Sequence, residues 1–383
     1  MFELSGDERI IVDTAADFAR KRLAPNSLDW EERKHFPVDE LRQAAALGMA
    51  AIYTREDVGG SGLRRIDGVR IFTELAKGDP VTAAFLSIHN MCTWMVDTYG
   101  TAEQRTEWIP QLAVMDKVAS YCLTEPAAGS DAAALSTKAV RDGDYYVLNG
   151  VKQFISGGGA SDVYVVMART GVDGPKGISA FIVEKGTPGL TFGSPEKKMG
   201  WHNQPTTQVI FDDVRVPATA MLGGAAGEGA GFGIAMNGLN GGRLNIAACS
   251  LGGAQAAYEA ARSYVNQREA FGHKLIDEPT IRFTLADMAT GLETSKLMLW
   301  RAAAALDDGH PDKVELCAMA KRYVTDTCFE VADKALQLHG GYGYLTEYGV
   351  EKIVRDLRVN RILEGANEIM RMVVGRAEAA KAE

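Results

Sequence analysis

The sequence VYVVMARTGVDGPKGISAFIVE, residues 163–184, contains two runs of β-branched and aromatic residues separated by a Gly-Pro turn. Residues of these types favour strands, and glycine and proline end them. Similar short runs occupy residues 145–148 and 206–211, and no helical segment lies between the four runs. Parallel βαβ units require intervening helices, so this part of the chain is expected to form an antiparallel sheet, barrel or sandwich.

Helical sequence flanks this β-rich region on both sides. Ile11, Ala15 and Phe18 share one face of an amphipathic helix that should end near Pro25, and Asp39 is a candidate N-cap for a second helix. Further helices are expected over residues 65–75, 81–99, 103–112, 234–266, 281–307, 313–339 and 368–380. The long C-terminal helices with broad apolar faces predict an antiparallel helical bundle, and the family resemblance described below implies a four-helix bundle. The fold class is therefore mainly α with a central β-domain: an N-terminal helical domain over residues 1–118, a β-domain over 119–228 and a helical bundle over 229–383.

Composition limits the classes of function. A chain of 383 residues exceeds one ordinary hydrophobic core, and its net charge of −9 argues against a nucleic-acid partner. Five cysteines, at 92, 122, 249, 317 and 328, include no C-x-x-C pair, which predicts free thiols and neither disulfides nor a metal site. The N-terminal MFELSGDERI lacks an apolar run, and no run approaches the roughly 18 apolar residues of a membrane span. We expect no membrane insertion, and a location in a bacterial cytoplasm or, for a processed eukaryotic chain, the mitochondrial matrix.

The glycine-rich run GGAAGEGAGFG, residues 223–233, does not fit G-x-G-x-x-G in any register and has no βαβ setting. A flexible linker between the β-domain and the bundle is the expected role. Walker A, HExxH and G-x-S-x-G patterns are absent from the sequence as well. The common nucleotide-binding and hydrolase signatures therefore do not apply.

Four other segments combine polar residues with structure breakers: YCLTEPAAGSD (121–131), FISGGG (154–159), QLHGGYGY (337–344) and RILEGANEIM (361–370). The first could approach a planar ring or a phosphate closely, or could simply be a loop between domains. The aromatic residue of the second could merely fill the core. The third could be an ordinary helix C-cap at Gly340.

Glu364, in the fourth segment, follows two apolar residues and precedes a glycine and a helix start. Desolvation in such surroundings raises the pKa of a carboxyl group, which makes Glu364 a candidate base. The alternative from the residues alone is a partner for the dipole of the following helix.

Taken together, six motifs in this order resemble the acyl-CoA dehydrogenase family over essentially the whole chain. They are YCLTEPAAGSD (121–131), NGVKQFISGG (149–158), GLNGGRLN (238–245), NQREAFG (266–272), QLHGGYGY (337–344) and RILEGANEIMR (361–371). The runs SIHNMCTW (87–94), GPKGIS (174–179), LNGGRLNIA (239–247) and FTLADMAT (283–290) are similar to the branch of the family that acts on isobutyryl-CoA in valine degradation.

The resemblance implies a non-covalent FAD, with residues from several segments around it. Thr124 would lie near the reactive edge of the flavin ring. Arg268 and the residues from Gln337 would hold the pyrophosphate and adenosine, partly across a subunit interface of a homotetramer. The implied FAD-binding residues are Tyr121, Cys122, Leu123, Thr124, Ser130, Phe154, Ile155, Ser156, Arg268, Phe271, Gln337, Leu338, His339, Gly340, Gly341, Ala366, Asn367 and Glu368. The implied substrate-binding residues are Ser130, Asn240, Gly241, Gly242, Arg243 and Arg376.

The implied reaction is the α,β-dehydrogenation of a short branched acyl-CoA, with isobutyryl-CoA converted to methacrylyl-CoA. Glu364 would remove the α-proton while a hydride passes from Cβ to flavin N5, and the electrons would continue to an electron-transfer flavoprotein. Some relatives carry the base near the position of Gly242 and Arg243. Residues 239–248 contain no carboxylate, so that arrangement does not apply here.

Two departures from the family pattern and three rival functions remain open. Ala127 replaces a common glycine, and Glu278-Pro279 replaces a polar pair that contacts FAD from a neighbouring subunit; Pro279 has no N–H to donate. One rival is a dehydrogenase for butyryl- or 2-methylbutyryl-CoA. The second is an acyl-CoA oxidase, which passes its electrons to O₂. The third is a non-enzymatic helical assembly that keeps the fold.

Overall fold

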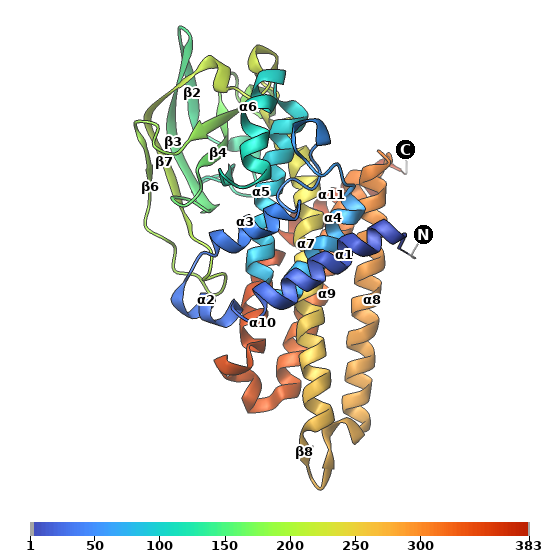
Figure 1. The fold of residues 1–383 in the computed structure, drawn as a ribbon. Helices are drawn as coiled ribbons and strands as arrows, with labels where there is room; N and C mark the ends of the chain where they lie inside the picture. The colour runs from blue at the N-terminus through green and yellow to red at the C-terminus, as the bar shows by residue number, and fades with distance from the viewer. Residues whose placement is uncertain (1–3, 382–383) are drawn as a thin grey trace.

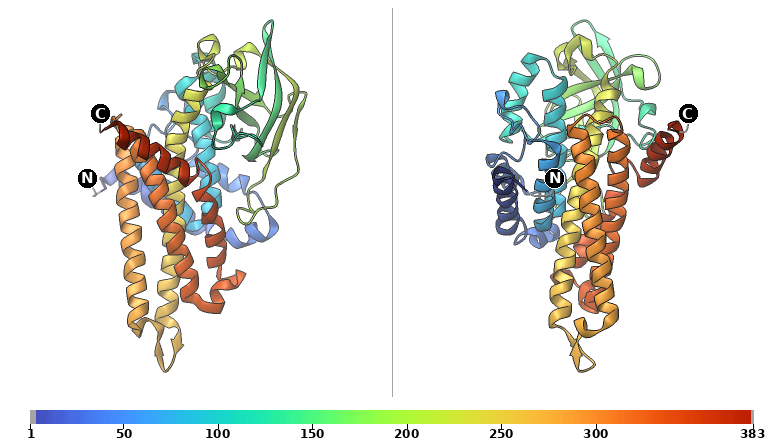
Figure 2. Two further views of the ribbon diagram at one scale, coloured as in Figure 1. Left: turned by 180° about the vertical axis from the view of Figure 1, so that it is seen from behind. Right: turned by 90° about the vertical axis from the view of Figure 1, so that its right-hand side faces the viewer.

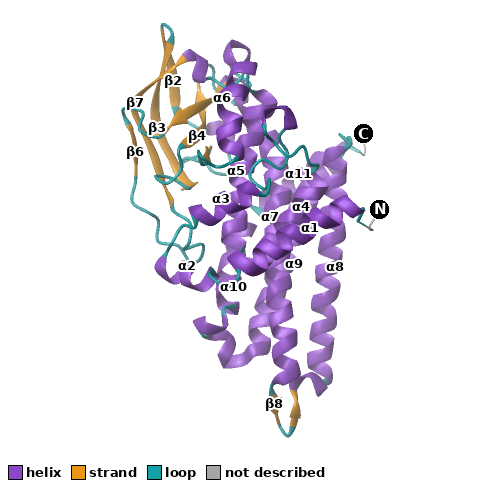
Figure 3. Ribbon diagram, viewed as in Figure 1, coloured by secondary structure: helices purple, strands orange, loops and turns teal. Residues whose placement is uncertain are grey.

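A β-sheet stands at one end of the molecule, and long helices extend away from it to a small hairpin at the opposite end (Figure 1). The structure is a computed structural model, and it describes residues 4–381. Figure 3 shows that the strands gather in one region between two helical parts of the chain, apart from the two short strands of that hairpin. The order helical, β and helical agrees with the expectation from the sequence.

The N-terminal part contains six α-helices: α1 (Gly6–Phe18), α2 (Ser27–Arg33), α3 (Val38–Ala46), α4 (Arg65–Gly78), α5 (Pro80–Tyr99) and α6 (Ala102–Ala113). Local sequence explains their starts. Ser5 and Glu8 form a capping box at α1, and Asp79 caps α5 ahead of Pro80. Asp39, however, is not an N-cap: α3 begins at Val38, so Asp39 lies in the first turn, where its charge favours the helix dipole.

The sheet consists of β1 (Ala119–Cys122), β2 (Lys138–Asp142), β3 (Tyr145–Ser156), β4 (Val163–Arg169), β5 (Ile178–Glu184), β6 (Leu190–Phe192) and β7 (Thr206–Pro217). The strand order is β1-β4-β2-β3-β7-β6, with β5 on the other edge of β4. Most pairs are antiparallel as expected, but β1 pairs with β4 in parallel, and β2 meets β4 in parallel at one residue pair. The two runs of residues 163–184 form β4 and β5, which are buried almost throughout and pair antiparallel.

The C-terminal part is built from α7 (Gly231–Gln267), α8 (Pro279–Asp307), α9 (Lys313–His339), α10 (Val350–Arg358) and α11 (Asn367–Ala380). The first three run side by side in both views of Figure 2. A hairpin of β8 (Glu269–Ala270) and β9 (His273–Lys274) joins α7 to α8. Because α7 also packs against α4 and α5, one hydrophobic core joins the N-terminal helices to the bundle.

The glycine-rich run of residues 223–233 packs closely against neighbouring backbone and does not form the flexible linker expected from the sequence. A β-carbon at Gly231, the first residue of α7, would lie 2.5 Å from the carbonyl carbon of Ser179 in β5. One at Gly227 would lie 1.9 Å from the carbonyl oxygen of Leu222. Gly231 therefore allows the start of α7 to approach the sheet closely, whereas Gly227 allows a tight turn after Leu222.

Three further observations bear on the sequence analysis. All five cysteines are buried and free, as predicted. Within residues 4–381, no cluster of three or more His, Cys, Asp or Glu side chains could hold a metal ion. No helix in the same part of the chain is both long and apolar enough to cross a membrane.

Candidate active site

Glu364 lies in a tight turn that connects α10 to α11. Its φ of +56° is left-handed, and Gly365 follows with a φ of +95°. A left-handed backbone is uncommon for a residue with a side chain and persists only where surrounding contacts hold it. The turn therefore directs the Glu364 side chain inward. Its left-handed backbone costs free energy, which contacts with the neighbouring helices must offset.

The Glu364 carboxylate packs against α7, and one of its oxygens has no hydrogen-bond donor among residues 4–381. Its Oε2 is shielded from solvent and has no hydrogen-bond partner among the described residues. A β-carbon on Gly242 would lie 2.4 Å from this oxygen, so only glycine leaves room for it. Burial raises the pKa of the carboxyl from 4.5 to about 7, although the positive charges of Arg243 and Lys321 act to lower it. A carboxyl with this pKa can accept a proton near neutral pH.

Arg243 binds the backbone at Glu364 and leaves its carboxylate unpaired. The guanidinium Nε donates to the Glu364 carbonyl oxygen at 3.1 Å, and Nη1 donates to Oδ1 of Asn240 at 2.8 Å. Both residues lie on α7 and are buried. The structure thus brings Gly242 and Arg243, with Asn240 bonded to Arg243, to the candidate base; all three belong to the implied substrate-binding residues.

Two buried cations, one at the Glu364 turn and one against α7, were not predicted from the sequence. Lys321 of α9 donates from Nζ to the carbonyl oxygen of Gly365 at 2.7 Å. Arg65 of α4 stacks on the rings of Tyr53 and Trp94, with its guanidinium carbon 3.8 and 4.8 Å from the two ring centroids. A β-carbon on Gly241 would lie 2.4 Å from Arg65 Nη1, so this cation lies against α7 one residue before Gly242. A single sequence gives no signal that separates such cations from surface ones.

The two segments expected to flank the flavin ring lie side by side. The backbone N–H of Gln153 donates to the Thr124 carbonyl at 2.8 Å, and Ser120 Oγ donates to the Ser156 carbonyl at 2.5 Å. These bonds join the end of β1 to the end of β3 and so place residues 121–124 beside residues 154–156. Cys122, Leu123 and Ile155 are buried in the domain.

The surface formed by residues 121–124 and 154–156 has features that suit a flat ring with polar edges. The Phe154 side chain is 64% exposed, and its φ of +59° turns it out of the sheet. Tyr121 Oη is buried and has no hydrogen-bond partner among the described residues. Burial raises the pKa of this hydroxyl, and the nearby Glu364 carboxylate raises it further. Tyr121 therefore connects the predicted ring-binding surface to the candidate base.

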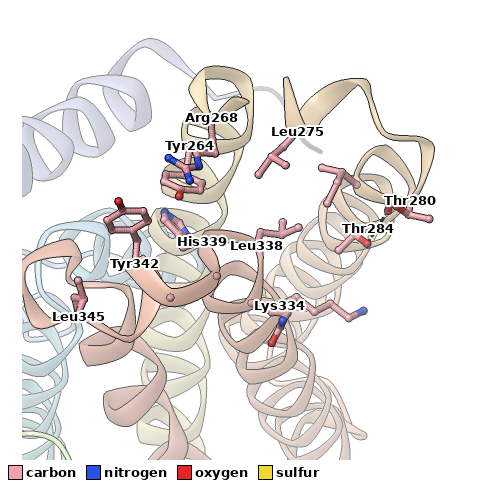
Figure 4. Close-up of a pocket in the computed structure, with 14 residues that line it drawn as sticks. Tyr264, Arg268, Leu275, Thr280, Thr284, Lys334, Leu338, His339, Tyr342 and Leu345 are labelled. Carbon is pink, nitrogen blue, oxygen red and sulfur yellow. Dashed lines mark hydrogen bonds between the residues drawn. The ribbon is translucent and has the colours of Figure 1, made fainter. Parts of the chain in front are cut away.

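A second group of predicted residues surrounds a cavity of about 770 Å³ at the far end of the bundle (Figure 4). His339 stacks on Tyr264 with ring centroids 4.6 Å apart, and Arg268 lies over the ring of Tyr342. Predicted cofactor residues on its wall are Arg268, Gln337, Leu338, His339, Gly340 and Gly341; other lining residues are Tyr264, Leu275, Thr280, Ile281, Thr284, Lys334, Tyr342 and Leu345.

This cavity is distant from Glu364 in the same chain. Gly242, against the base, and Tyr264, in the cavity, are separated by about 33 Å along α7, at about 1.5 Å per helical residue. The predicted residues at this cavity therefore lie far from the candidate base of the same chain.

Other predicted residues are spread over the surface or bound within the protein. Asn367 is buried and hydrogen-bonded to Lys321, Thr325 and Asp326, so its side chain is already occupied. Ser130, Arg376 and Glu368 are exposed, and Arg376 has no ion-pair partner within residues 4–381. Ala366 occupies the N-cap position of α11.

Glu278 and Pro279, which depart from the family pattern, lie next to the hairpin of β8 and β9. Phe271 is 94% exposed at the hairpin tip. Glu278 Oε1 lies 2.6 Å from Nε2 of His273 in β9, and Pro279 is the first residue of α8. Glu278 thus fixes the hairpin to the start of α8, beside the cavity wall formed by Thr280 and Ile281.

Comparison with known proteins decides the family. The models for the N-terminal, middle and C-terminal domains of acyl-CoA dehydrogenases match residues 5–116, 120–214 and 229–379. The chain belongs to the acyl-CoA dehydrogenase family. Members of this family are oxidoreductases, and the helical, β and helical parts described above are its three domains.

Individual relatives of the acyl-CoA dehydrogenase family match nearly the full chain. The mitochondrial isobutyryl-CoA dehydrogenases of Dictyostelium discoideum and Bos taurus are 54% and 52% identical, covering 97% and 98% of this chain and 89% of each relative. The solved butyryl-CoA dehydrogenase of Megasphaera elsdenii is 38% identical, with a TM-score of 0.95 over 99% of this chain and all of that one. A glutaryl-CoA dehydrogenase of Mycobacterium smegmatis, solved in complex with FADH2, is 30% identical, with a TM-score of 0.92 over 99% of this chain and 96% of that one.

Proposed function

We propose that this acyl-CoA dehydrogenase converts isobutyryl-CoA to methacrylyl-CoA in valine degradation, with Glu364 as the base. The observation that carries the base assignment is the buried Glu364 carboxylate, whose Oε2 lacks a partner and whose pKa lies near 7. The acyl group is inferred from the isobutyryl-CoA dehydrogenases that are 52–54% identical over nearly the whole chain.

The chain's own residues account for the proton transfer. The Glu364 carboxylate, which has no ion-pair partner within residues 4–381, would take the α-proton of the thioester. Gly242 leaves room for the carboxylate. Arg243 holds the Glu364 backbone, so the base keeps its direction while its carboxylate stays free. FAD, when bound, supplies the acceptor for the hydride that leaves Cβ.

The chain offers suitable contacts for FAD in two places. Tyr121 and Phe154, with residues 122–124, 155 and 156, would hold the flavin ring over the β-domain. Arg268, Phe271 and residues 337–341 would hold the pyrophosphate and adenosine of a cofactor bound mainly to another subunit, because the cavity is about 33 Å from the base along α7. This division of one cofactor between subunits supports a homo-oligomer, and we propose a homotetramer.

The remaining parts of the proposal follow the same reasoning. Exposed Ser130 and Arg376, with the α7 residues 240–243, would contact the CoA thioester. Electrons would pass from the reduced flavin to an electron-transfer flavoprotein. The two isobutyryl-CoA dehydrogenases are mitochondrial proteins, so a location in the mitochondrial matrix, or in the cytoplasm of a bacterium, fits the proposal.

Anaerobic bleaching of flavin absorbance by a panel of acyl-CoA thioesters tests the function. We expect isobutyryl-CoA to reduce the flavin-loaded protein faster than butyryl-CoA or 2-methylbutyryl-CoA does. Glu364→Gln should bind flavin normally and lose the reduction by about 10²- to 10⁴-fold, the usual contribution of a general base. If no thioester bleaches the wild-type protein, the proposed function is wrong; if butyryl-CoA is fastest, only the acyl assignment is.

The electron acceptor separates a dehydrogenase from an oxidase. After anaerobic reduction, admission of air should reoxidise the flavin slowly, and an electron-transfer flavoprotein should reoxidise it quickly. Rapid reoxidation by O₂ alone would instead identify an oxidase.

A further inference from the structure

Lys321 is a buried lysine without a carboxylate partner. It lies on α9 and is fully buried. Its Nζ donates to the Gly365 carbonyl at 2.7 Å and to Oδ1 of Asn367 at 2.9 Å. No ion pair involves Lys321 within residues 4–381. Burial of an ammonium group without a counter-ion is costly, so the contacts that it makes at the Glu364 turn require an explanation.

Two cations from opposite helices hold consecutive carbonyl groups of the turn. Arg243 from α7 donates to the carbonyl of Glu364, and Lys321 from α9 donates to the carbonyl of Gly365. These are the two residues with left-handed backbone, at φ values of +56° and +95°. Hydrogen bonds from charged donors are roughly twice as strong as neutral ones, so this pair can hold a strained turn in place.

The arrangement leaves the base unpaired while placing positive charge near it. Neither cation forms an ion pair with the Glu364 carboxylate within the described part of the chain, and Oε2 has no donor. A direct salt bridge would lower the pKa of Glu364 below its usual value and weaken it as a base. Cations on the backbone carbonyls instead fix the turn and moderate the effect of burial on the carboxyl.

We propose that Lys321 is a positioning residue for the catalytic base: its bonds to Gly365 and Asn367 hold the Glu364 turn in its left-handed conformation, and its charge favours the ionised carboxylate. This proposal rests on the assignment of Glu364 as the base. Lys321 itself touches neither the reacting carbon atoms nor the transferred proton.

The charged groups around Glu364 and Lys321 determine in which direction the pKa of Glu364 changes when Lys321 is replaced. Arg243 from α7 and Lys321 from α9 favour ionisation of Glu364, and its neighbours Tyr121 from β1 and Cys92 from α5 are both neutral at working pH. Burial lowers the pKa of Lys321 to about 7; the charge of Glu364 raises it, Arg243 lowers it, and Asp326 of α9 and Glu368 of α11 raise it. Below about pH 7, Lys321 is therefore a cation. Removal of the Lys321 charge therefore raises the pKa of Glu364, and the rise of the reaction rate with pH moves to higher pH.

The experiment measures anaerobic flavin reduction against pH in flavin-loaded protein, with whichever acyl-CoA reduces the wild type fastest. For Lys321→Met, we expect a loss of about 10²-fold in rate, typical of a misplaced catalytic group, and a shift of the midpoint of the rate–pH profile to higher pH. For Lys321→Ala, added ethylammonium should restore at least part of the rate, because it can refill the space and the charge. Lys296→Ala, on α8 and paired with Glu293, serves as the control and should behave as wild type.

A second variant covers the case in which Lys321 substitutions do not fold. Asn367→Ala removes one of the two hydrogen-bond acceptors of Lys321 and keeps the Lys321 charge. The rate of flavin reduction should therefore fall, while the midpoint of its pH profile stays constant. A wild-type rate and midpoint in folded Lys321→Met would overturn the proposal. A lower rate without a shifted midpoint, and without rescue by the amine, would also overturn it, because that result indicates a structural role only. Failure of every thioester to reduce the wild type would instead refute the proposed function.

Discussion

Gly242 of α7 packs directly against the carboxylate of Glu364: a β-carbon on Gly242 would lie 2.4 Å from Oε2 and 3.1 Å from Oε1. The family resemblance gave two alternative positions for the base, one on this helix and one at Glu364. In the structure, the two positions meet at the same point. A side chain at Gly242 would occupy the space of the Glu364 carboxylate. A glutamate that points inward at position 364 therefore requires glycine at position 242.

Gly242→Ala should therefore separate stability from activity. Alanine favours a helix over glycine by about 1 kcal/mol, but its methyl group would displace the Glu364 carboxylate. We expect a protein that folds and binds flavin, with anaerobic reduction slowed by about 10²-fold. Gly375→Ala on α11 is the matched control, because a β-carbon there meets nothing within 4 Å. Equal rates for the two variants would show that the contact at Gly242 is unimportant.

The raised pKa of Glu364 predicts a pH-dependent stability. The folded protein holds the proton more tightly than the unfolded chain, which titrates near 4.5, so the stabilisation is complete below pH 4.5 and is lost as pH rises through about 7. The difference corresponds to about 3 kcal/mol at most. Glu364→Gln removes this titration. Its melting temperature relative to wild type should therefore be higher at pH 8 than at pH 5.5, and a pH-independent difference would contradict the assigned pKa.

Lys352 should be essential to the stability of the whole chain. Its Nζ donates to Asp79 at 2.8 Å and to Asp356 at 2.7 Å, and all three side chains are buried. Asp79 also accepts from Asn203, and Asp356 accepts from the backbone of Trp201, so the group joins α5 and α10 to the β-domain. Lys352→Met leaves two buried carboxylates unpaired and should cost about 3–5 kcal/mol. Thermal unfolding would show this loss, whereas Lys21→Met, at an exposed ion pair, should have little effect.

Phe271 should contribute to assembly and not to the stability of the subunit. Its side chain is 94% exposed at the hairpin tip, which lies beside the cavity of Arg268 and His339. If that cavity receives the cofactor of another subunit, Phe271→Ala should lower the flavin content and weaken the oligomer. Sedimentation analysis and flavin absorbance measure the two effects. Val172→Ala, in a loop of the β-domain and 72% exposed, is the control. Unchanged assembly and flavin content in Phe271→Ala would count against a shared cofactor site.

Long helices with regular apolar faces were predicted well from the sequence. The expected bounds of α9, residues 313–339, agree with the structure, and α5 begins only one residue earlier than expected. The short α2 and α10 were not predicted, although Val350, Ile353, Val354 and Leu357 give α10 a clear apolar face. The parallel pairing of β1 with β4 was also missed, since a four-residue strand carries no signal of its partner.

The sequence by itself determined the order of helical and β parts and the free cysteines, and its motif order led to the prediction of Glu364 as the base, because periodicity, spacing and motif order are local or linear properties. The tertiary structure alone decided that Oε2 of Glu364 is unpaired, that Gly242 makes room for it, and that Arg243 and Lys321 bind its backbone and not its carboxylate. The physical reason is that burial and charge act through space. The pKa of Glu364 depends on how α7, α9 and the turn before α11 meet, and these segments are far apart in the chain.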